Sequence, residues 1–542
     1  MTPTTPRFLR GAAFGFAALC LMPLVAVTLA ALLGDMDTVR QLARTVLLQY
    51  TGTTLRLVAL VGTGTAIIGT GCAWLVTMTE FRGRRWLEVA LALPFAFPAY
   101  VMAYAYTDVL DHPGIVQSTL RDLTGWGPRD YWFPEIRSLG GAALMLTLVL
   151  YPYVYLLARA AFLQQSATAY LAARSLGKTA WGAFRTTSLP LARPAIVGGM
   201  LLAIMETIAD YGTVAFFGVQ TFSNGIYRAW VGMFDRGAAA QLALCLLAFA
   251  LFLALLERAQ RGRARHYNTG NRQEMLTRIP LSGWRNRAAT VACLLPVLLG
   301  FVLPVIILGL MALRSEQDLL SPRYLLFLQN SLKLAATAAI VTVVGAVVIA
   351  VAFRMAPSRG TAGAGHIARI GYAVPGGVIA VGLMVPFANL DNRIDAIMEA
   401  NFGIDTGLLF TGSIWVLVMA YVIRFLAAAL NTYEAGLTQL PQNLDAAART
   451  LGSRPLTLLR RLYLPALWPS VATALLIVFV DVMKELPATL IMRPFNTDTL
   501  AIQAHRLASD ERLEGAAVPS LVLVAVGLVP VILLCRSLGR RT

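Results

Sequence analysis

Long apolar segments alternate with short polar segments along the whole chain, and this alternation predicts an integral membrane protein. A helix that crosses a bilayer needs about 20 consecutive apolar residues. Six segments of this kind lie in the first half of the chain, at residues 11–34, 55–79, 86–108, 138–162, 195–219 and 240–256. Six more lie in the second half, at residues 288–313, 330–353, 370–388, 411–430, 470–492 and 516–535. We therefore expect an all-α membrane fold with about twelve transmembrane helices.

Short motifs of the first six spans recur in the second six at a nearly constant spacing, close to half the length of the chain. Thr-Leu-Arg-Leu at 54–57 corresponds to Ser-Leu-Lys-Leu at 331–334, and Pro98 corresponds to Pro375. An even number of spans per half makes both halves enter the membrane in the same direction, so the repeat is parallel. Both prolines lie inside predicted spans, which we expect them to kink or break. The predicted organisation is a first half at 1–257, a linker at 258–287 and a second half at 288–542.

The distribution of charge fixes the expected orientation. The chain is 57% hydrophobic and 13% charged, with a net charge of +17, which excludes an ordinary soluble globular protein. The arginines are concentrated in the segments after every second span, and the linker 258–287 carries eight of them against one glutamate. This pattern follows the positive-inside rule rather than that of a nucleic-acid-binding surface. It places these segments and both termini in the cytoplasm.

Several features that the sequence could have carried, namely a cleaved signal peptide, a metal or disulfide motif and an ATP-binding loop, are not expected. Arg7 and Arg10 precede an apolar segment that is longer than the core of a signal peptide, so we expect an uncleaved first span. The five cysteines lie inside apolar segments without a paired spacing, and the four histidines are scattered, which gives no metal-ligand or disulfide motif. The sequence also lacks a phosphate-binding loop of the GxxxxGK[ST] type, so we expect ATP to bind elsewhere.

Two polar loops, one in each half, carry the same motif at the spacing of the repeat. Residues 172–177 read Ala-Ala-Arg-Ser-Leu-Gly and residues 447–452 read Ala-Ala-Arg-Thr-Leu-Gly, followed by Pro190 and Pro465. We expect each loop to form two short helices, the first ended by the glycine and the second stopped by the proline. A loop between helices is normally about 2–8 residues long. The duplicated loops 163–194 and 438–469 are therefore predicted to be docking surfaces for a soluble partner.

These loops resemble the two Glu-Ala-Ala…Gly motifs that form the coupling helices of binding-protein-dependent ABC importer permeases. The downstream Leu-Pro pairs at 189–190 and 464–465 fit this pattern, whereas Leu171 and Ala446 stand where the family has an acidic residue. The resemblance implies that the loops bind two copies of an ABC ATPase. The predicted docking residues are Ala172, Ala173, Arg174, Gly177, Arg185, Pro190, Ala447, Ala448, Arg449, Gly452, Arg460 and Pro465.

The same resemblance implies the protein's surroundings. The chain would be a bacterial inner-membrane permease with both halves fused, receiving substrate from a periplasmic binding protein. It would catalyse no reaction and hold no cofactor, since ATP–Mg would be bound by the partner ATPase. Residues 206–219 and 484–495 further resemble the iron(III) branch of these importers. Thiamine, phosphonate or another small solute stays open as the substrate, and so does an ion-coupled secondary transporter, which would not explain the two loops.

Ionisable residues at membrane depth are costly and usually face a bundle interior or water. The spacing of Glu206 and Asp210 predicts one helical face, and Asp481 and Glu485 repeat the pair at the equivalent place in the second half. Carboxylates, or a phenol, suit a hard cation such as Fe³⁺. The alternative is that they cap kinked helices, pair with Lys484 or lie near the outer surface. We expect a translocation pathway, without a tight metal site, lined by Glu206, Asp210, Tyr211, Asp481, Lys484 and Glu485.

Overall fold

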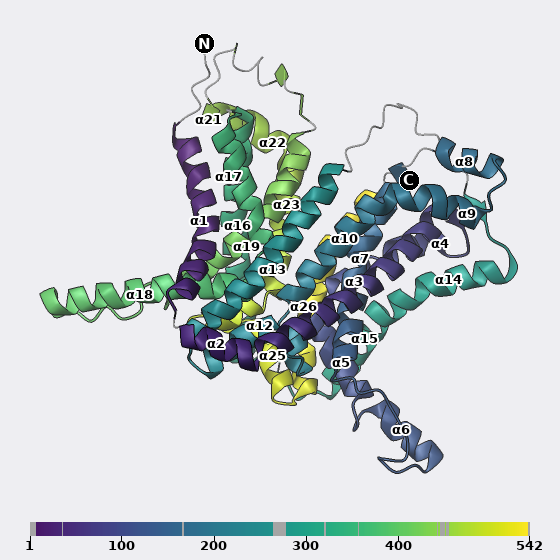
Figure 1. Cartoon of the computed structure of the whole chain (residues 1–542), viewed down its shortest axis with the longest axis horizontal. Coiled ribbons are helices and arrows are strands. Elements are labelled where there is room, and N and C mark those ends of the chain that lie inside the picture. The colour runs from purple at the N-terminus through teal and green to yellow at the C-terminus, as the bar shows by residue number, and fades with distance from the viewer. Residues whose placement is uncertain are drawn as a thin grey trace. The chain divides into compact units, whose positions relative to one another are not determined.

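The computed structural model describes residues 7–34, 36–164, 167–263, 278–318, 321–355, 357–438, 440–441, 443–444, 450 and 455–539. The chain is almost entirely helical (Figure 1). It divides into two compact units, each made of three stretches of chain. Unit 1 comprises residues 1–48, 222–251 and 318–503, and unit 2 comprises residues 49–221, 252–317 and 504–542.

Unit 2 is built around the middle of the first half. From that half it contains α3 (Leu47–Met78), β1 (Thr79–Glu80), α4 (Arg84–Ala90), the 3-10 turn η1 (Leu93–Ala96), α5 (Ala99–Leu110), α6 (Ile115–Thr124), α7 (Leu139–Gln164), α8 (Ala167–Ser175), α9 (Ala180–Ala183), the π-turn η2 (Phe184–Ser188), α10 (Leu189–Ala209) and α11 (Gly212–Phe216). From the second half it takes β2 (Ile279–Pro280), α14 (Gly283–Val297), the π-turn η4 (Leu298–Val302), α15 (Leu303–Arg314), most of α25 (Leu500–Ser509) and α26 (Leu513–Gly539). The strands β1 and β2 pair in parallel over two residues.

Unit 1 is built around the middle of the second half. From that half it contains α16 (Pro322–Met355), α17 (Arg359–Ile370), the 3-10 turn η5 (Gly371–Ala373), α18 (Gly376–Phe402), α19 (Ile414–Leu437), α21 (Pro455–Leu458), the π-turn η6 (Leu459–Tyr463), α22 (Leu464–Ala466), α23 (Trp468–Lys484) and α24 (Pro487–Met492). From the first half it takes α1 (Arg7–Leu32), α2 (Met36–Thr45), α12 (Phe222–Tyr227), the π-turn η3 (Arg228–Gly232) and most of α13 (Arg236–Arg263).

The helices fall where the apolar segments predict them. Among the described residues, nine helices are long and apolar enough to cross a membrane, and three strongly bent pairs raise this number to twelve if each pair is one span. All twelve overlap the twelve predicted apolar segments, although the helix predicted at 195–219 runs from Trp181 to Ala209 and so ends ten residues earlier than expected. The all-α membrane fold is therefore confirmed.

The two units do not follow the two sequence halves. α1 packs on α16, α17 and α18 of unit 1, although it belongs to the first half. In the same way, α15 and α26 of the second half pack on each other and on α5 in unit 2. Each unit thus combines four middle spans of one half with the first and last spans of the other. The predicted halves 1–257 and 288–542 describe the sequence repeat, and the linker between them is described only at 258–263 and 278–287.

Prolines break two of the spans at equivalent places. The chain turns by 94° between η1 and α5, at Pro98, and by 111° between η5 and α18, at Pro375. Both prolines and the residues before them are extended, with ψ between 121° and 144°. Extended backbone is expected there because a proline ring disfavours the helical conformation in the preceding residue. The predicted breaks at Pro98 and Pro375 are confirmed.

An ion pair ties the helix before each of these breaks to the next span. In unit 2, Glu88 of α4 pairs with the buried Arg159 of α7. In unit 1, Arg369 of α17 pairs with Glu434 of α19. Arg159 and Glu434 stand at equivalent positions of the two halves, whereas Glu88 lies ten residues before Pro98 and Arg369 lies six residues before Pro375. The two ion pairs therefore make similar connections with opposite charges on the second span, but they are not repeats of one another residue by residue.

Candidate functional site: docking loops and helix breaks

A glycine ends α8 in the first docking loop. Gly177 has a φ of +83°, and its N–H donates to the carbonyl of Arg174 at 3.1 Å. The N–H of Lys178 donates to the carbonyl of Ala173 at 3.2 Å. These two bonds are those of a Schellman motif, which satisfies the last carbonyls of a helix and favours glycine at the left-handed position. The predicted role of Gly177 as the end of the first short helix is confirmed.

The docking residues of this loop differ in exposure. Arg174, Arg185 and Pro190 are exposed, and so is Ala172. Ala173 is buried, in an apolar cluster with Tyr170, Ala183 and Ile279. Burial raises the pKa of the Tyr170 phenol. The loop therefore presents arginines outward while its inner face rests on β2 at the end of the linker.

Pro190 does not stop the second short helix, which corrects the expectation from the sequence. The helix continues from Trp181 to Ala209 as one span. The π-turn η2 precedes the proline, and the N–H of Leu189 reaches back five residues to the carbonyl of Phe184. This wider turn makes the missing N–H of Pro190 tolerable within a continuous helix.

The second docking loop is described only in part. Ala447, Ala448, Arg449 and Gly452 lie outside the described residues. Arg460 and Pro465 are described and exposed. Arg460 lies in the π-turn η6, which again precedes the proline, and Pro465 lies in α22. In this copy the chain bends by 68° between α22 and α23. The bend lies at Leu467, shortly after Pro465.

Glu206 and Asp210 do not share one helical face, because the helix ends between them. α10 stops at Ala209, and Asp210 is extended, with a ψ of 133°. Its carboxylate accepts the N–H groups of Thr213 and Val214, each at 3.1 Å, and the Thr213 hydroxyl at 3.0 Å. Asp210 therefore caps α11, as short polar side chains do at helix starts. Glu206 stays on α10 and is half-buried.

The second copy of the carboxylate pair is arranged in the same way. α23 ends at Lys484, and Glu485 is extended, with a ψ of 126°. Its carboxylate accepts the N–H groups of Ala488 and Thr489 at 3.0 Å each and therefore caps α24. Asp481 stays on α23, 3.8 Å from the ammonium group of Lys484. The expected i, i+4 face is wrong for this copy too, whereas the pairing with Lys484 is present.

Arg424 and Gly376 lie against the Glu485 cap. Sequence reasoning marked Gly376 only as part of the break after Pro375 and did not single out Arg424. The Arg424 guanidinium of α19 lies 3.8 Å from Glu485, whose side chain is only 2% exposed. A Cβ atom at Gly376 would lie 2.6 Å from Glu485 Oε1, so only glycine leaves room for the carboxylate. Arg424 stands inside the apolar segment 411–430, and the membrane-depth charge that marked Glu206 could have marked it as well.

Aromatic and imidazole rings lie around the end of α10 at Asp210. Tyr211 is buried, and its ring meets the ring of His505 at 5.7 Å between centroids. The Nδ1 atom of His505 also shares a 2.8 Å hydrogen bond with the hydroxyl of the buried Tyr104. Tyr211, predicted from the sequence to line the pathway, is thus buried against His505 at the end of α10. Within the described residues, no three His, Cys, Asp or Glu side chains are grouped to hold a metal ion.

Outside the spans, Arg137 fastens the polar loop 111–138 of unit 2 to the turn before α26. Its guanidinium donates to both oxygens of Glu511, at 2.7 and 2.8 Å, and to Asp111 at 2.9 Å. It also lies 5.0 Å from the centroid of the Phe216 ring, at the end of α11. The hydrogen bonds from Arg137 lower the pKa of the Glu511 carboxyl. This cluster connects the polar loop to the helix that Asp210 caps.

Comparison with known proteins identifies the class of protein that carries these features. The family model described as "Binding-protein-dependent transport system inner membrane component" matches residues 65–266 and 345–542. The match covers more than half of the chain and occurs once in each half. The chain therefore belongs to this family, as a multi-pass inner-membrane permease of ABC importers in which both halves are fused.

Individual relatives extend the similarity over the full length. The chain is 27% identical over 522 residues to the "Fe(3+)-transport system permease protein FbpB 2" of Haemophilus influenzae, covering 95% of each chain. It is 24% identical over 493 residues to the "Probable ABC transporter permease protein y4fN" of Sinorhizobium fredii, covering 84% of this chain and 82% of that one. The "Molybdenum transport system permease protein ModB" of Escherichia coli is 26% identical over 204 residues, covering 35% of this chain and 86% of that one.

A solved structure is also similar over part of the chain. It is a chain of a bacterial alginate ABC transporter in complex with an alginate-bound periplasmic protein. It shares 18% identity, with a TM-score of 0.39, and covers 48% of this chain and 94% of that chain.

Proposed function

We propose that the chain is the permease subunit of an ATP-driven importer for iron(III). The observation that carries this proposal is the similarity to an Fe(3+)-transport permease over 95% of both chains. The similarity to the molybdenum-transport relative from Escherichia coli, in contrast, extends over only 35% of this chain, so it is weaker support for a substrate. In this proposal a periplasmic binding protein delivers the iron, and both termini are cytoplasmic. The chain itself catalyses no reaction, and ATP–Mg is bound by the partner ATPase.

The docking loops 163–194 and 438–469 are proposed to bind two copies of that ATPase. One loop belongs to each compact unit, so each unit carries its own docking element. The Schellman motif at Gly177 and the apolar cluster under Ala173 hold the first loop in a defined shape. Exposed arginines such as Arg174 and Arg185 offer charge for an acidic surface. Leu171 and Ala446 lack the family's acid, so this contact depends on other residues.

The helix ends at Asp210 and Glu485 are proposed to lie beside the iron pathway. Asp210 and Glu485 use their carboxylate oxygens to accept N–H groups, which favours a role in shaping the breaks. Glu206 and Asp481 stand one turn earlier, are half-buried, and offer the oxygen ligands that Fe³⁺ prefers. Lys484, 3.8 Å from Asp481, opposes tight cation binding. A weak contact of this kind suits a pathway that must release what it carries.

The test is uptake of ⁵⁵Fe(III) into vesicles that contain the permease, its ATPase and the binding protein. Glu206→Gln combined with Asp481→Asn should lower the initial uptake rate about tenfold, the effect of about 1.4 kcal/mol, while ATP hydrolysis persists. Glu135→Gln, which changes an exposed carboxylate outside the spans, is the matched control and should be silent. Unchanged uptake by the double variant in a folded, ATPase-competent complex would refute the pathway.

The same vesicle assay distinguishes iron(III) from other substrates, and an ATP-driven importer from a secondary transporter. Molybdate, sulfate, 2-aminoethylphosphonate and thiamine should not compete with iron if the substrate assignment is right. Transport of one of these solutes in place of iron would keep the importer and replace its cargo. Uptake that follows a proton or sodium gradient without ATP would instead indicate a secondary transporter.

A further inference from the structure

An apolar groove runs along α1 in unit 1, and its shape follows from two close helix contacts. The backbone of α1 at Pro23 meets Gly382 of α18, where a side chain larger than glycine would collide. Near its end, α1 meets α13, because a Cβ atom at Gly34 would lie 3.1 Å from Nε2 of Gln241. Beside and between these contacts lies a groove of 690 Å³, a volume in the range of about 300–1,000 Å³ that is typical of sites for small organic ligands.

One stripe of α1 forms the wall of this groove. Leu21, Val25, Leu29 and Leu33 recur at every fourth position, and all four line it. Their exposure rises along the helix from 40% to 46%, 51% and 83%. At about 1.5 Å per residue the stripe is about 18 Å long, close to the roughly 15 Å thickness of one leaflet of the hydrocarbon core. The groove therefore has the length and polarity of a single acyl chain.

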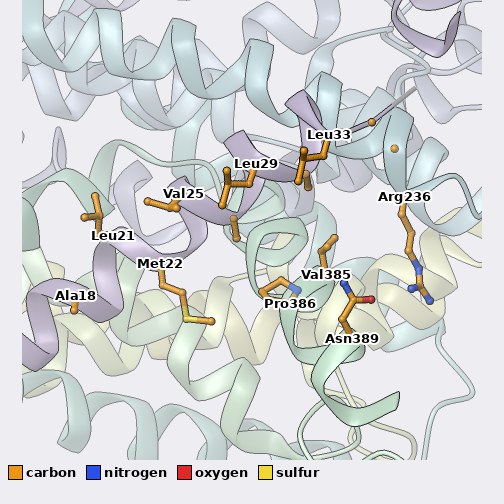
Figure 2. Close-up of a pocket in the computed structure, with 14 residues that line it drawn as sticks. Ala18, Leu21, Met22, Val25, Leu29, Leu33, Arg236, Val385, Pro386 and Asn389 are labelled. Carbon is orange, nitrogen blue, oxygen red and sulfur yellow. The ribbon is translucent and has the colours of Figure 1, made fainter. Parts of the chain in front are cut away.

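A cation stands at one end of this apolar stripe. Figure 2 shows the row of side chains from Ala18 of α1 to Leu33, the residue after its end, with Arg236 at the Leu33 end. Arg236 is exposed, at the start of α13, and Asn389 of α18 is the other polar side chain that lines the groove. The neighbouring carboxylate of Asp235 accepts the N–H of Ala238 at 2.9 Å and so caps α13. The groove thus combines an apolar channel with a cationic end.

From this arrangement we infer that the groove is a binding site for one phospholipid of the bilayer. One acyl chain lies along the stripe from Leu21 to Leu33, and the phosphate binds the guanidinium of Arg236, with Asn389 as a further donor. Arginine is suited to this contact because its planar donors match phosphate oxygens. A helix of a partner protein would fill the apolar stripe equally well, but it would give no reason for a cation at the end. This inference is independent of the transported substrate.

The test uses native mass spectrometry of the full chain, purified in detergent and supplied with dioleoylphosphatidylglycerol. Wild type should retain one lipid at detergent concentrations that remove all others, and dioleoylglycerol, which lacks the phosphate, should not be retained. Arg236→Gln should lower lipid retention about tenfold, and Arg236→Lys should lower it less. Arg323→Gln, at the exposed start of α16 and away from the groove, is the matched control and should match wild type.

A second variant tests the apolar part of the groove without changing charge. Leu29→Trp should fill it and reduce retention about tenfold. The lipid should also raise the melting temperature of wild type and of Arg323→Gln but not that of Arg236→Gln, because a ligand stabilises only the state that binds it. Equal retention by wild type and Arg236→Gln, or a lipid-free chain that forms a dimer through this face, would overturn the inference. Leu29→Trp could fail to fold, but Arg236 is exposed, so Arg236→Gln is expected to fold and keeps the inference testable.

Discussion

Asp210 and Glu485 occupy equivalent positions in the two halves, and each binds the N–H groups of the short helix that follows it. The glutamate has one methylene more, and it also faces the guanidinium of Arg424. Free N–H groups at membrane depth have no water to bond with. These two carboxylates therefore satisfy N–H donors that the starts of α11 and α24 would otherwise leave without a partner.

The two caps should differ in strength. Asp210→Ala and Glu485→Ala each remove a cap, which costs about 1–2 kcal/mol. Glu485→Ala also removes a carboxylate beside the partly buried Arg424, at a further cost of about 1–3 kcal/mol. We therefore expect the larger loss of stability for Glu485→Ala, measured by thermal unfolding in detergent. Adding Arg424→Met should recover part of it, and equal losses at the two caps would show that Arg424 contributes nothing.

Two adjacent glycines offer a matched pair of substitutions. In Gly376→Ala the new Cβ would lie 2.6 Å from Glu485 Oε1 and 2.7 Å from Arg424 Nη1. In Gly377→Ala the nearest atom would be Ile226 Cγ2 at 3.9 Å, an ordinary contact. Gly376→Ala should lower both the melting temperature and transport, with a stability loss of about 1–3 kcal/mol, while Gly377→Ala should resemble wild type. Two equally mild variants would mean that the Glu485 cap tolerates displacement.

The lengths of the apolar segments and the positions of the prolines predicted most of the fold. The twelve apolar segments predict the spans because a bilayer demands one length of helix, and Pro98 and Pro375 mark breaks through their effect on the preceding residue. The sequence did not predict that α1 and α13 of the first half belong to unit 1, or that α14, α15 and α26 of the second half belong to unit 2. These spans are apolar around most of their circumference, so their sequences do not state which neighbours they pack on.

The candidate site was predicted less well, for a local reason. The spacing of Glu206 and Asp210 indicates one face only if the helix continues, and it ends at Ala209. The pattern Asp210-Tyr-Gly-Thr213 is itself a helix-start signal, since a short carboxylate often binds the N–H three residues later. Glu88 and Arg159 are separated by 71 positions in the sequence, so no local sequence pattern predicts their ion pair.

Gly177 provides a test of the first docking loop. Its φ of +83° costs a side-chain-bearing residue about 1–2 kcal/mol, although a Cβ atom there would meet nothing within 4 Å. Gly177→Ala should therefore loosen the loop and weaken binding of the ATPase several-fold, measured by titration of the purified ATPase onto the permease. Gly71→Ala, inside α3 with equally open space and no positive φ, should leave binding unchanged. Unchanged binding in Gly177→Ala would argue against a preformed loop.

The cluster at Arg137 predicts a pH dependence of stability. The pKa of Glu511 is lowered by the hydrogen bonds from Arg137, so the folded state favours the ionised carboxylate over its ordinary pKa of about 4.3. Its contribution to stability is fully present above that value and is lost as pH falls through the lowered pKa of the folded state. Because Glu511 is largely exposed, the contribution should be at most about 1 kcal/mol.

Glu511→Gln should therefore unfold at a lower temperature than wild type near pH 7, and the difference should shrink below about pH 4. Added salt should reduce the difference as well, since exposed charges are screened. Glu135→Gln removes an exposed carboxylate of loop 111–138, the loop that contains Arg137, and should show no such dependence. A difference between wild type and Glu511→Gln that stays constant from pH 7 to pH 3 would show that Glu511 acts through packing, because protonation would then leave its contribution intact.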